Sequence, residues 1–142
     1  MTLSDQDRTF LESHDSAAMV TVGEDGVAKA VRMSVALVDG NLWSSGRQDR
    51  VRTRRLRKDP RCTLFIFDPG YTWLTLETTV TLLDGPDAPQ LNLNFMRQIQ
   101  AKPEGPLSWF GGDLSQEQFL QTMVDEGRLI YQFEVLRTYG MH

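Results

Sequence analysis

Eight of the fifteen Lys and Arg residues of this 142-residue chain lie in one short stretch, Arg47 to Arg61. The stretch reads RQDRVRTRRLRKDPR and contains only two acidic residues, Asp49 and Asp59, so its formal charge is +6 while the remainder of the chain carries −10. Guanidinium groups present planar pairs of N–H donors that match the oxygens of phosphate and carboxylate. An acidic chain that gathers its positive charge in one place is therefore expected to bind an anion there.

Three interpretations of this basic stretch are open. On a helix, Arg50, Arg54 and Arg57 fall on one face at i, i+4 and i+7, so several guanidinium groups can converge on a phosphorylated small molecule. The same charge on a solvated surface helix would add only solubility, since the helix contributes just Val51 and Leu56 to a core. A basic patch is also typical of nucleic-acid binding, but a pI of about 5.1 disfavours that function. We favour a site for a phosphorylated small molecule.

The composition removes several other kinds of site. The chain has two histidines, His14 and His142, and one cysteine, Cys62, which excludes a Cys/His zinc site and an internal disulfide. A Ser/His/Asp or Cys/His nucleophile would have to use a histidine near one end of the sequence. We therefore identify no catalytic residue and no metal ligand, and we expect a bound cofactor to supply any difficult chemistry.

Length and hydropathy define the class of protein. The chain is long enough for a hydrophobic core, and we expect a single domain over residues 1–142. No apolar run reaches the roughly 20 residues that span a bilayer, and the N-terminal segment MTLSDQDRTF lacks the pattern of a secretory signal. With one cysteine and no such signal, we expect a cytoplasmic protein that binds neither membrane nor nucleic acid.

The elements that must position the basic stretch are mostly strands. Apolar runs and alternation predict strands at 17–22, 27–38, 42–45, 62–67, 71–83 and 129–135. Capping signals and apolar spacing predict helices at 3–13, 47–58, 87–100 and 115–127, with a loop at 102–113. Short turns between the first strands favour an antiparallel sheet, and closure of such a sheet removes exposed edges. We predict an α+β fold with a β-barrel core of about six strands.

Several segments, taken in order, resemble a known family. They are TVGEDGVAKAVRMSVALVDGNLWSS, RVRTRRLRKDPRCTLFIF, WLTLETTVTLL and RLIYQFEVLRTYG, which together extend over most of residues 17–140. The most specific piece is the basic helix that leads into Leu-x-x-Asp-Pro-Arg and a buried strand. The chain resembles the flavin and deazaflavin oxidoreductases of the split β-barrel fold, also called the pyridoxamine-5′-phosphate-oxidase-like family. Within that family it is most similar to the group that uses the deazaflavin F420.

This resemblance implies a mainly β form of the α+β class, a six-stranded antiparallel split β-barrel with peripheral helices. It also implies a homodimer, with the cofactor in a groove between the subunits. The segment implied to bind the cofactor's phosphate contains Arg47, Arg50, Arg52 and Arg54. The segment implied to line the tricyclic ring contains Arg32, Met33, Ser34 and Val35.

Two further features bear on the cofactor. Many relatives have Glu-Gly-x-Ala where this chain has Glu77-Thr78-Thr79-Val80, a change that narrows any groove at that wall. The basic helix carries more charge than the phosphate of FMN requires, whereas F420 has a longer tail of phosphate and glutamates, so we favour F420. The resemblance thus implies a reductase that transfers hydride from F420H2 to a small unsaturated organic acceptor. The alternatives are an FMN-dependent oxidase or reductase of the same fold, and a non-catalytic carrier of either cofactor.

Overall fold

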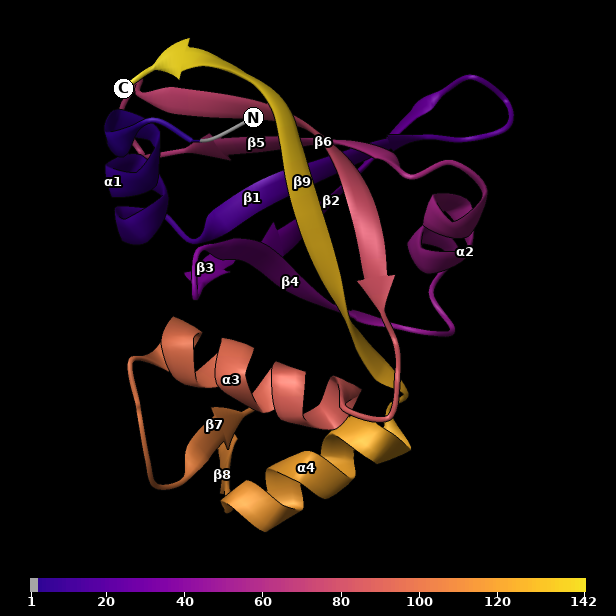
Figure 1. The fold of residues 1–142 in the computed structure, drawn as a ribbon, viewed down its shortest axis with the longest axis vertical. Coiled ribbons are helices and arrows are strands. Elements are labelled where there is room, and N and C mark those ends of the chain that lie inside the picture. Colours follow the sequence, from indigo (N-terminus) through magenta and orange to yellow (C-terminus); the bar gives the residue numbers. More distant parts are fainter. Residues whose placement is uncertain (1–2) are drawn as a thin grey trace.

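A curled antiparallel sheet forms the body of the molecule, and helices lie around it (Figure 1). The computed structural model describes residues 3–142, which form four helices and nine strands. The helices are α1 (Asp5–Ser13), α2 (Val51–Lys58), α3 (Ala88–Gln100) and α4 (Gln116–Asp125). The strands are β1 (Ser16–Val22), β2 (Ala28–Ser34), β3 (Ala36–Val38), β4 (Asn41–Arg47), β5 (Arg61–Phe67), β6 (Trp73–Leu83), β7 (Leu107–Trp109), β8 (Gly112–Leu114) and β9 (Arg128–Met141).

Seven of the strands in residues 3–142 pair in the order β2-β1-β5-β6-β9-β4-β3, and all neighbours are antiparallel. The first half of β9 pairs with β4, and nearly its whole length pairs with β6. The β6–β9 pairing shifts register between Glu77 and Thr78, where β9 contains one extra residue, Leu136, and such a bulge increases local twist. The hydroxyl of Thr78 donates to the carbonyl of Cys62 (2.7 Å), so this side chain packs inside the sheet rather than toward a groove. The architecture is the expected mainly β, α+β split barrel.

The described chain has seven strands in this sheet, not the six predicted from the sequence. The predicted strand at 27–38 is divided at Val35, because residues 28–34 pair with β1 whereas residues 36–38 pair with β4. The prediction of a loop at 102–113 was also wrong, since β7 and β8 form a hairpin there. Its turn residues, Phe110 and Gly111, both have positive φ. The usual residues at such a turn are Asn-Gly or Asp-Gly, so Phe-Gly gave no hairpin signal.

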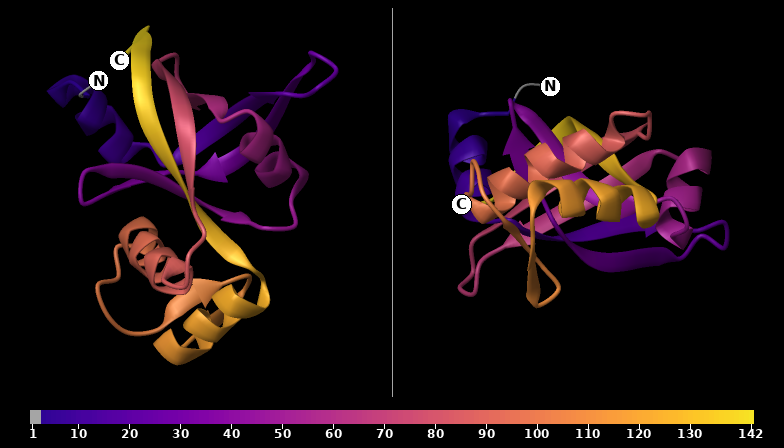
Figure 2. Two further views of the ribbon diagram at one scale, coloured as in Figure 1. Left: turned by 45° about the vertical axis from the view of Figure 1, so that its right-hand side comes forward. Right: turned by 90° about the horizontal axis from the view of Figure 1, so that it is seen from below.

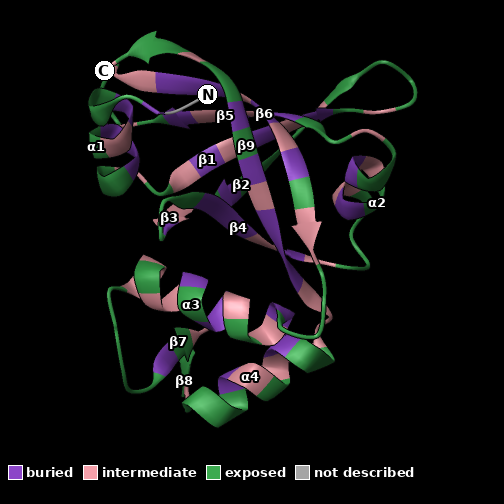
Figure 3. Cartoon of the chain, in the orientation of Figure 1, coloured by how far each residue is buried: buried purple, intermediate pink, exposed green. Residues whose placement is uncertain are grey.

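The main core lies inside the curl of the sheet, and Figure 3 shows buried residues recurring along its central strands. Burial of each large aliphatic side chain contributes about 1.5–3 kcal/mol by removing its surface from water. Tyr131 of β9 is the largest of the fully enclosed residues and brings a hydroxyl group into this core. The same core also encloses Leu64 and Ile66 of β5 and Leu74 and Leu76 of β6.

Helices α1 and α4 begin at the capping residues that the sequence indicates. Ser4 accepts a hydrogen bond from the N–H of Asp7 at the start of α1, and Ser115 forms a capping box with Gln118 at the start of α4. Helix α3 covers β9, β4 and β3, and α4 and the β7–β8 hairpin lie behind it, at one end of the molecule (Figure 2). None of the helices within residues 3–142 has the length and apolar character needed to cross a membrane.

Candidate functional site

The basic stretch begins as strand and only then becomes helix. Arg47 is the last residue of β4, and α2 begins at Val51, so the helix predicted at 47–58 starts later than expected. Arg50 is the extended N-cap residue of α2, and its side chain makes no capping hydrogen bond. The helix ends before Asp59, which is extended because a residue that precedes proline avoids the α conformation.

Helix α2 is anchored to the barrel by Thr53 and Leu56, its two buried side chains. The hydroxyl of Thr53 donates to the carbonyl of Arg47 (2.6 Å) and is also hydrogen-bonded to the hydroxyl of Tyr131. Gly46 lies against the ring of Tyr131, so closely that a Cβ at position 46 would come within 2.3 Å of Cζ. The start of α2 is therefore fixed by a packing contact that requires glycine at position 46.

Several basic side chains of the stretch are already paired within the protein. Arg47 donates to both carboxylate oxygens of Asp49 (3.1 Å each), and this contact lowers the pKa of Asp49 from its ordinary value. Arg57 donates to the carboxylate of Asp84 (2.9 Å). Arg54 donates to the backbone carbonyl of Asp49 (3.1 Å). Of the three arginines predicted to share a helix face, one is thus neutralised by a carboxylate.

Arg52 and Arg50 are placed differently from these paired arginines. The Nε atom of Arg52 is enclosed by protein, yet it has no hydrogen-bond partner among residues 3–142. Enclosed N–H groups without an acceptor are rare and cost about 1–3 kcal/mol. Arg50 is exposed beside it, at the start of the helix. The structure thus holds a half-buried guanidinium at the start of α2 with no protein anion to receive it.

The strand segment expected to line a cofactor ring is divided between the two faces of the sheet. Met33 and Val35 are buried in the core, whereas Arg32 and Ser34 are exposed on the outer face. Arg32 donates to the hydroxyl of Ser16 (3.2 Å) and borders a cavity of about 270 Å³. The other lining residues of that cavity include Ala17, Ala18, Ala30, Val31 and Phe67. Met33 and Val35 can contribute to a site on this face only through their backbone.

Strand β4 connects this segment to the start of the basic stretch. The hydroxyl of Ser44 donates to the carbonyl of Ser34 (2.6 Å), and Arg47 follows Ser44 on the same strand. At a rise of about 3.3 Å per residue, the three steps from Ser44 to Arg47 cover about 10 Å. The segment around Ser34 and the start of the basic stretch therefore border one region of the molecule.

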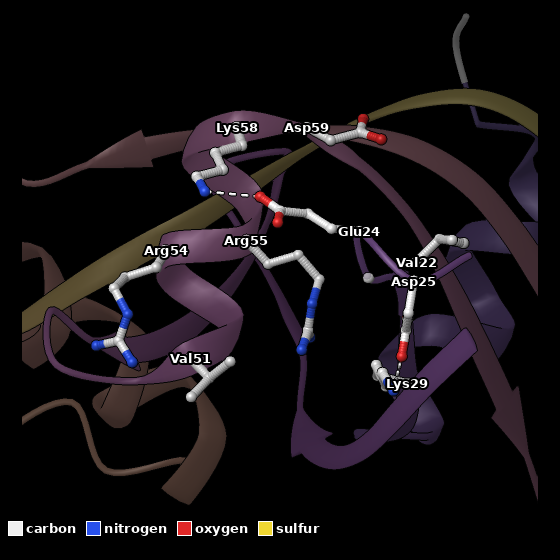
Figure 4. Close-up of a pocket in the computed structure, with 10 residues that line it drawn as sticks. Val22, Glu24, Asp25, Lys29, Val51, Arg54, Arg55, Lys58 and Asp59 are labelled. Carbon is white, nitrogen blue, oxygen red and sulfur yellow. Dashed lines mark hydrogen bonds and ion pairs between the residues drawn. The ribbon is translucent and has the colours of Figure 1, made fainter. Parts of the chain in front are cut away.

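A second region lies on the outer side of α2, where a cavity of about 530 Å³ separates this helix from the turn between β1 and β2 (Figure 4). We call it the α2 cavity. Its basic lining residues are Lys29, Arg54, Arg55 and Lys58. Among these, only Arg54 was predicted from the sequence, because the turn and the helix are far apart along the chain. The acidic pair in the turn, Glu24-Asp25, was the one available signal of a partner for the basic helix.

No side chain within residues 3–142 is placed as an evident general acid or base at these two regions. Burial raises the pKa of the Cys62 thiol to about 12, so a thiolate is not accessible there. Both histidines lie with α1, where His142 is hydrogen-bonded to Asp7 (2.7 Å) and His14 stacks on Phe10, away from α2 (Figure 1). Among residues 3–142 as a whole, no group of three His, Cys, Asp or Glu side chains is arranged to hold a metal ion.

Comparisons with known proteins agree with the observed fold. A family model described as pyridoxamine 5′-phosphate oxidase matches residues 3–135. No curated protein sequence matches the chain. The structure is similar to a conserved hypothetical protein from Mycobacterium tuberculosis, with a TM-score of 0.75 and 17% identity over 99% of this chain and 86% of the other.

Two further similar structures belong to proteins whose function is stated. One is an F420 reductase, with a TM-score of 0.71 and 16% identity over 96% of this chain and 98% of the other. Another is HutZ, a heme storage protein from Vibrio cholerae, with a TM-score of 0.67 and 10% identity over 99% of this chain and 96% of the other. At these identities the likeness to solved structures shows a shared fold alone, and one fold supports several functions.

Proposed function

Because the chain belongs to the pyridoxamine 5′-phosphate oxidase family, which includes oxidoreductases, we propose that it is a reductase dependent on the deazaflavin F420. In this proposal, two copies of the chain bind the cofactor between them and reduce a small unsaturated organic acceptor. Bound F420H2 supplies the hydride. The protein supplies binding, orientation and exclusion of water.

The observation that carries this proposal is the unpaired guanidinium of Arg52. A phosphate group accepts hydrogen bonds from guanidinium in pairs, and each bond to a charged partner contributes about 1.5–3 kcal/mol. Arg52 is half-buried without an acceptor of its own in residues 3–142, and Arg50 extends from the adjacent helix terminus. These two residues would hold the phosphate most directly. Arg47 and Arg54 add positive potential, although both already contact Asp49.

The outer face of β2 is where we expect the ring to lie. Ser34 and Arg32 offer exposed polar groups on that face, and the core packing of Met33 and Val35 holds the strand rigid behind them. Ser44, which contacts Ser34, lies about 10 Å along β4 from Arg47, a length that the chain between a flavin-type ring and its phosphate can span. One cofactor molecule can thus reach both predicted segments.

The remaining charge supports F420 over FMN. Besides the arginines already assigned to the phosphate, Arg55 also lacks a carboxylate partner among the described residues, since it donates to the hydroxyl of Thr21 (2.9 Å). A single phosphate does not require so many guanidinium groups. A cofactor whose phosphate is followed by glutamates offers further carboxylates to them.

Association of two copies is supported by the outer face of the sheet. Phe67 remains 54% exposed there, although it is apolar, and it borders the cavity beside Arg32. Exposed apolar residues that gather on one face commonly mark an interface. A second copy on this face would also enclose the cavity. Light scattering is expected to give twice the mass of one chain, and a monomer at micromolar concentration would contradict this part of the proposal.

Spectroscopic titration with F420 and with FMN tests the cofactor. We expect F420 to bind with a Kd in the micromolar range or tighter, with an affinity that falls as salt rises. The double variant Arg50→Ala/Arg52→Ala should bind about tenfold more weakly or worse. Arg61→Ala is the matched control, because Arg61 is exposed and paired with Asp59. Unchanged affinity in the double variant would remove the phosphate assignment.

The other functions correspond to other results of the same experiments. Tighter binding of FMN than of F420 would identify the flavin-dependent alternative. Oxidation of F420H2 in the presence of enones or quinones is expected for a reductase. Tight binding of F420 without turnover of any acceptor would instead identify a carrier.

A further inference from the structure

The α2 cavity contains positive charge besides that of Arg50 and Arg52, the two residues that would hold the phosphate most directly. Arg55 extends into it from α2 and donates to the hydroxyl of Thr21 (2.9 Å), while Arg54 donates to the backbone carbonyl of Asp49 (3.1 Å) (Figure 4). Neither partner carries a negative charge at the contact. Each guanidinium therefore keeps its full charge, and most of its five N–H donors stay available.

The acidic residues around the cavity are already paired with other basic groups. Lys29 contacts Asp25 at 3.1 Å, and Arg61, which lies outside the cavity, contacts Asp59 at 2.8 Å. The backbone N–H of Val27 and then Lys29 lower the pKa of Asp25, and Arg61 lowers the pKa of Asp59, so both acids stay ionised and paired near neutral pH. The charge left unmatched in the cavity is that of its two arginines.

One ion pair bridges the cavity and can be replaced. Lys58 at the end of α2 contacts Glu24 of the β1–β2 turn (2.7 Å), and Figure 4 shows this pair above the guanidinium of Arg55. The two side chains are 73% and 81% exposed, and ion pairs at such exposure contribute about 0–1 kcal/mol. An anion that enters the cavity can therefore replace Glu24 as the partner of Lys58 at little cost.

We propose that the α2 cavity binds a small anion with two or more carboxylate or phosphate groups, held by Arg54, Arg55 and Lys58. The volume of about 530 Å³ suits a ligand of that size. Val22 and Val51, which are 51% and 58% exposed, border the cavity and offer contact to an aliphatic part of the ligand. Glu24 competes with the ligand for Lys58.

Two kinds of molecule could supply an anion of this chemistry. One is the glutamate-bearing tail of the cofactor proposed above, and the other is a separate polyanionic metabolite. The α2 cavity can hold either anion whether or not the chain binds F420. Failure of the cofactor assignment and failure of this site therefore give different results.

Calorimetric titration with citrate tests the site, combined with NMR of the arginine Nε–H resonances. Citrate is expected to shift the resonances of Arg54 and Arg55, with an affinity that falls as salt rises. Arg55→Gln should weaken binding about tenfold, and Glu24→Gln should tighten it several-fold because Lys58 is released. Arg61→Gln removes one positive charge outside the cavity and also releases Asp59, which lines it, so it should weaken binding by no more than about threefold, clearly less than Arg55→Gln.

Two results would overturn the proposal. One is the absence of any citrate-dependent shift at Arg54 and Arg55. The other is an equal loss of affinity in Arg61→Gln and Arg55→Gln, which would indicate attraction by overall charge. If Arg55→Gln fails to fold because its contact with Thr21 is lost, Lys58→Gln replaces it, since Lys58 is exposed.

The source of the anion follows from competition. F420 with its glutamates, and a form that keeps the phosphate but lacks them, are titrated with and without saturating citrate. Citrate that raises the Kd of the glutamate-bearing form alone identifies the cofactor tail as the ligand. Independent binding of citrate and of both forms identifies a separate anion. Citrate binding without any F420 binding would contradict the proposed function and leave the site intact.

Discussion

The position of α2 depends on the close approach of Gly46 to Tyr131, and Gly46→Ala tests this dependence. An added Cβ would lie 2.3 Å from Cζ, 2.5 Å from the hydroxyl oxygen and 2.6 Å from Cε2 of the Tyr131 ring. Non-bonded carbon atoms prefer about 3.5–4.0 Å. Tyr131 is fully buried, so its ring cannot move into solvent. Either the ring or strand β4 must therefore shift.

The expected cost follows from two losses. Overpacking of a buried site by a methyl group typically costs about 1–3 kcal/mol. Displacement of the Tyr131 ring also breaks its buried hydrogen bond to Thr53, which contributes about 1 kcal/mol. We expect Gly46→Ala to lower the free energy of unfolding by about 2–4 kcal/mol. Cofactor affinity should fall as well, because Thr53 sets the position of Arg50 and Arg52.

Urea unfolding and F420 titration measure the two effects on the same protein samples. Tyr131→Phe is the matched control, because it removes the hydroxyl and keeps the ring, and it should cost only about 1 kcal/mol. Adding Tyr131→Leu to Gly46→Ala removes the clash and should cost less than the two single changes together. Wild-type stability and wild-type F420 affinity in Gly46→Ala would refute the reasoning.

Three further predictions concern single side chains. Arg52→Gln should lower F420 affinity about tenfold or more, while the free energy of unfolding in urea changes by less than about 0.5 kcal/mol. The Nε of Arg52 has no hydrogen-bond partner among residues 3–142, so the substitution breaks no hydrogen bond of that atom, and a large loss of stability would contradict this prediction. Cys62 should react with a thiol reagent only after unfolding, because burial raises its pKa to about 12, so rapid labelling of the folded protein would be contrary evidence. The carboxyl group of Asp59 should titrate in NMR at about 2, below its ordinary 3.8, because Arg61 donates hydrogen bonds to it. Since the folded-state pKa is the lower one, stabilisation by this pair is present above pH 3.8 and is lost as the pH falls toward 2. In Arg61→Gln the Asp59 pKa should return toward 3.8, and an unchanged titration would exclude Arg61 as the cause.

Signals within a few residues were sufficient to predict most of the elements. Ser4 and Ser115 supply hydroxyl groups to the first turns of α1 and α4, and Pro60 ends α2. Runs of apolar, aromatic and β-branched residues placed β1, β5 and β6 close to their observed bounds. These contacts join residues that are close together in the sequence, so they can be predicted from it.

Contacts between distant residues account for what the sequence did not reveal. The predicted strand at 27–38 is divided because its two parts pair with different strands, β1 and β4, and Thr53 near the start of α2 is hydrogen-bonded to Tyr131 of β9. The clustered positive charge is visible in the sequence, but the acidic residues that pair with it are not. Asp84, which neutralises Arg57, and Glu24, which contacts Lys58, lie far from α2 in the sequence.

A structure of the protein with F420 bound tests the central claim most directly, since that claim joins the basic stretch to the anionic end of a redox cofactor. We predict the phosphate within hydrogen-bonding distance of Arg50 and Arg52, with the ring on the outer face of β2 where two copies of the chain meet. A bound cofactor elsewhere, with both guanidinium groups in open solvent, would contradict the account.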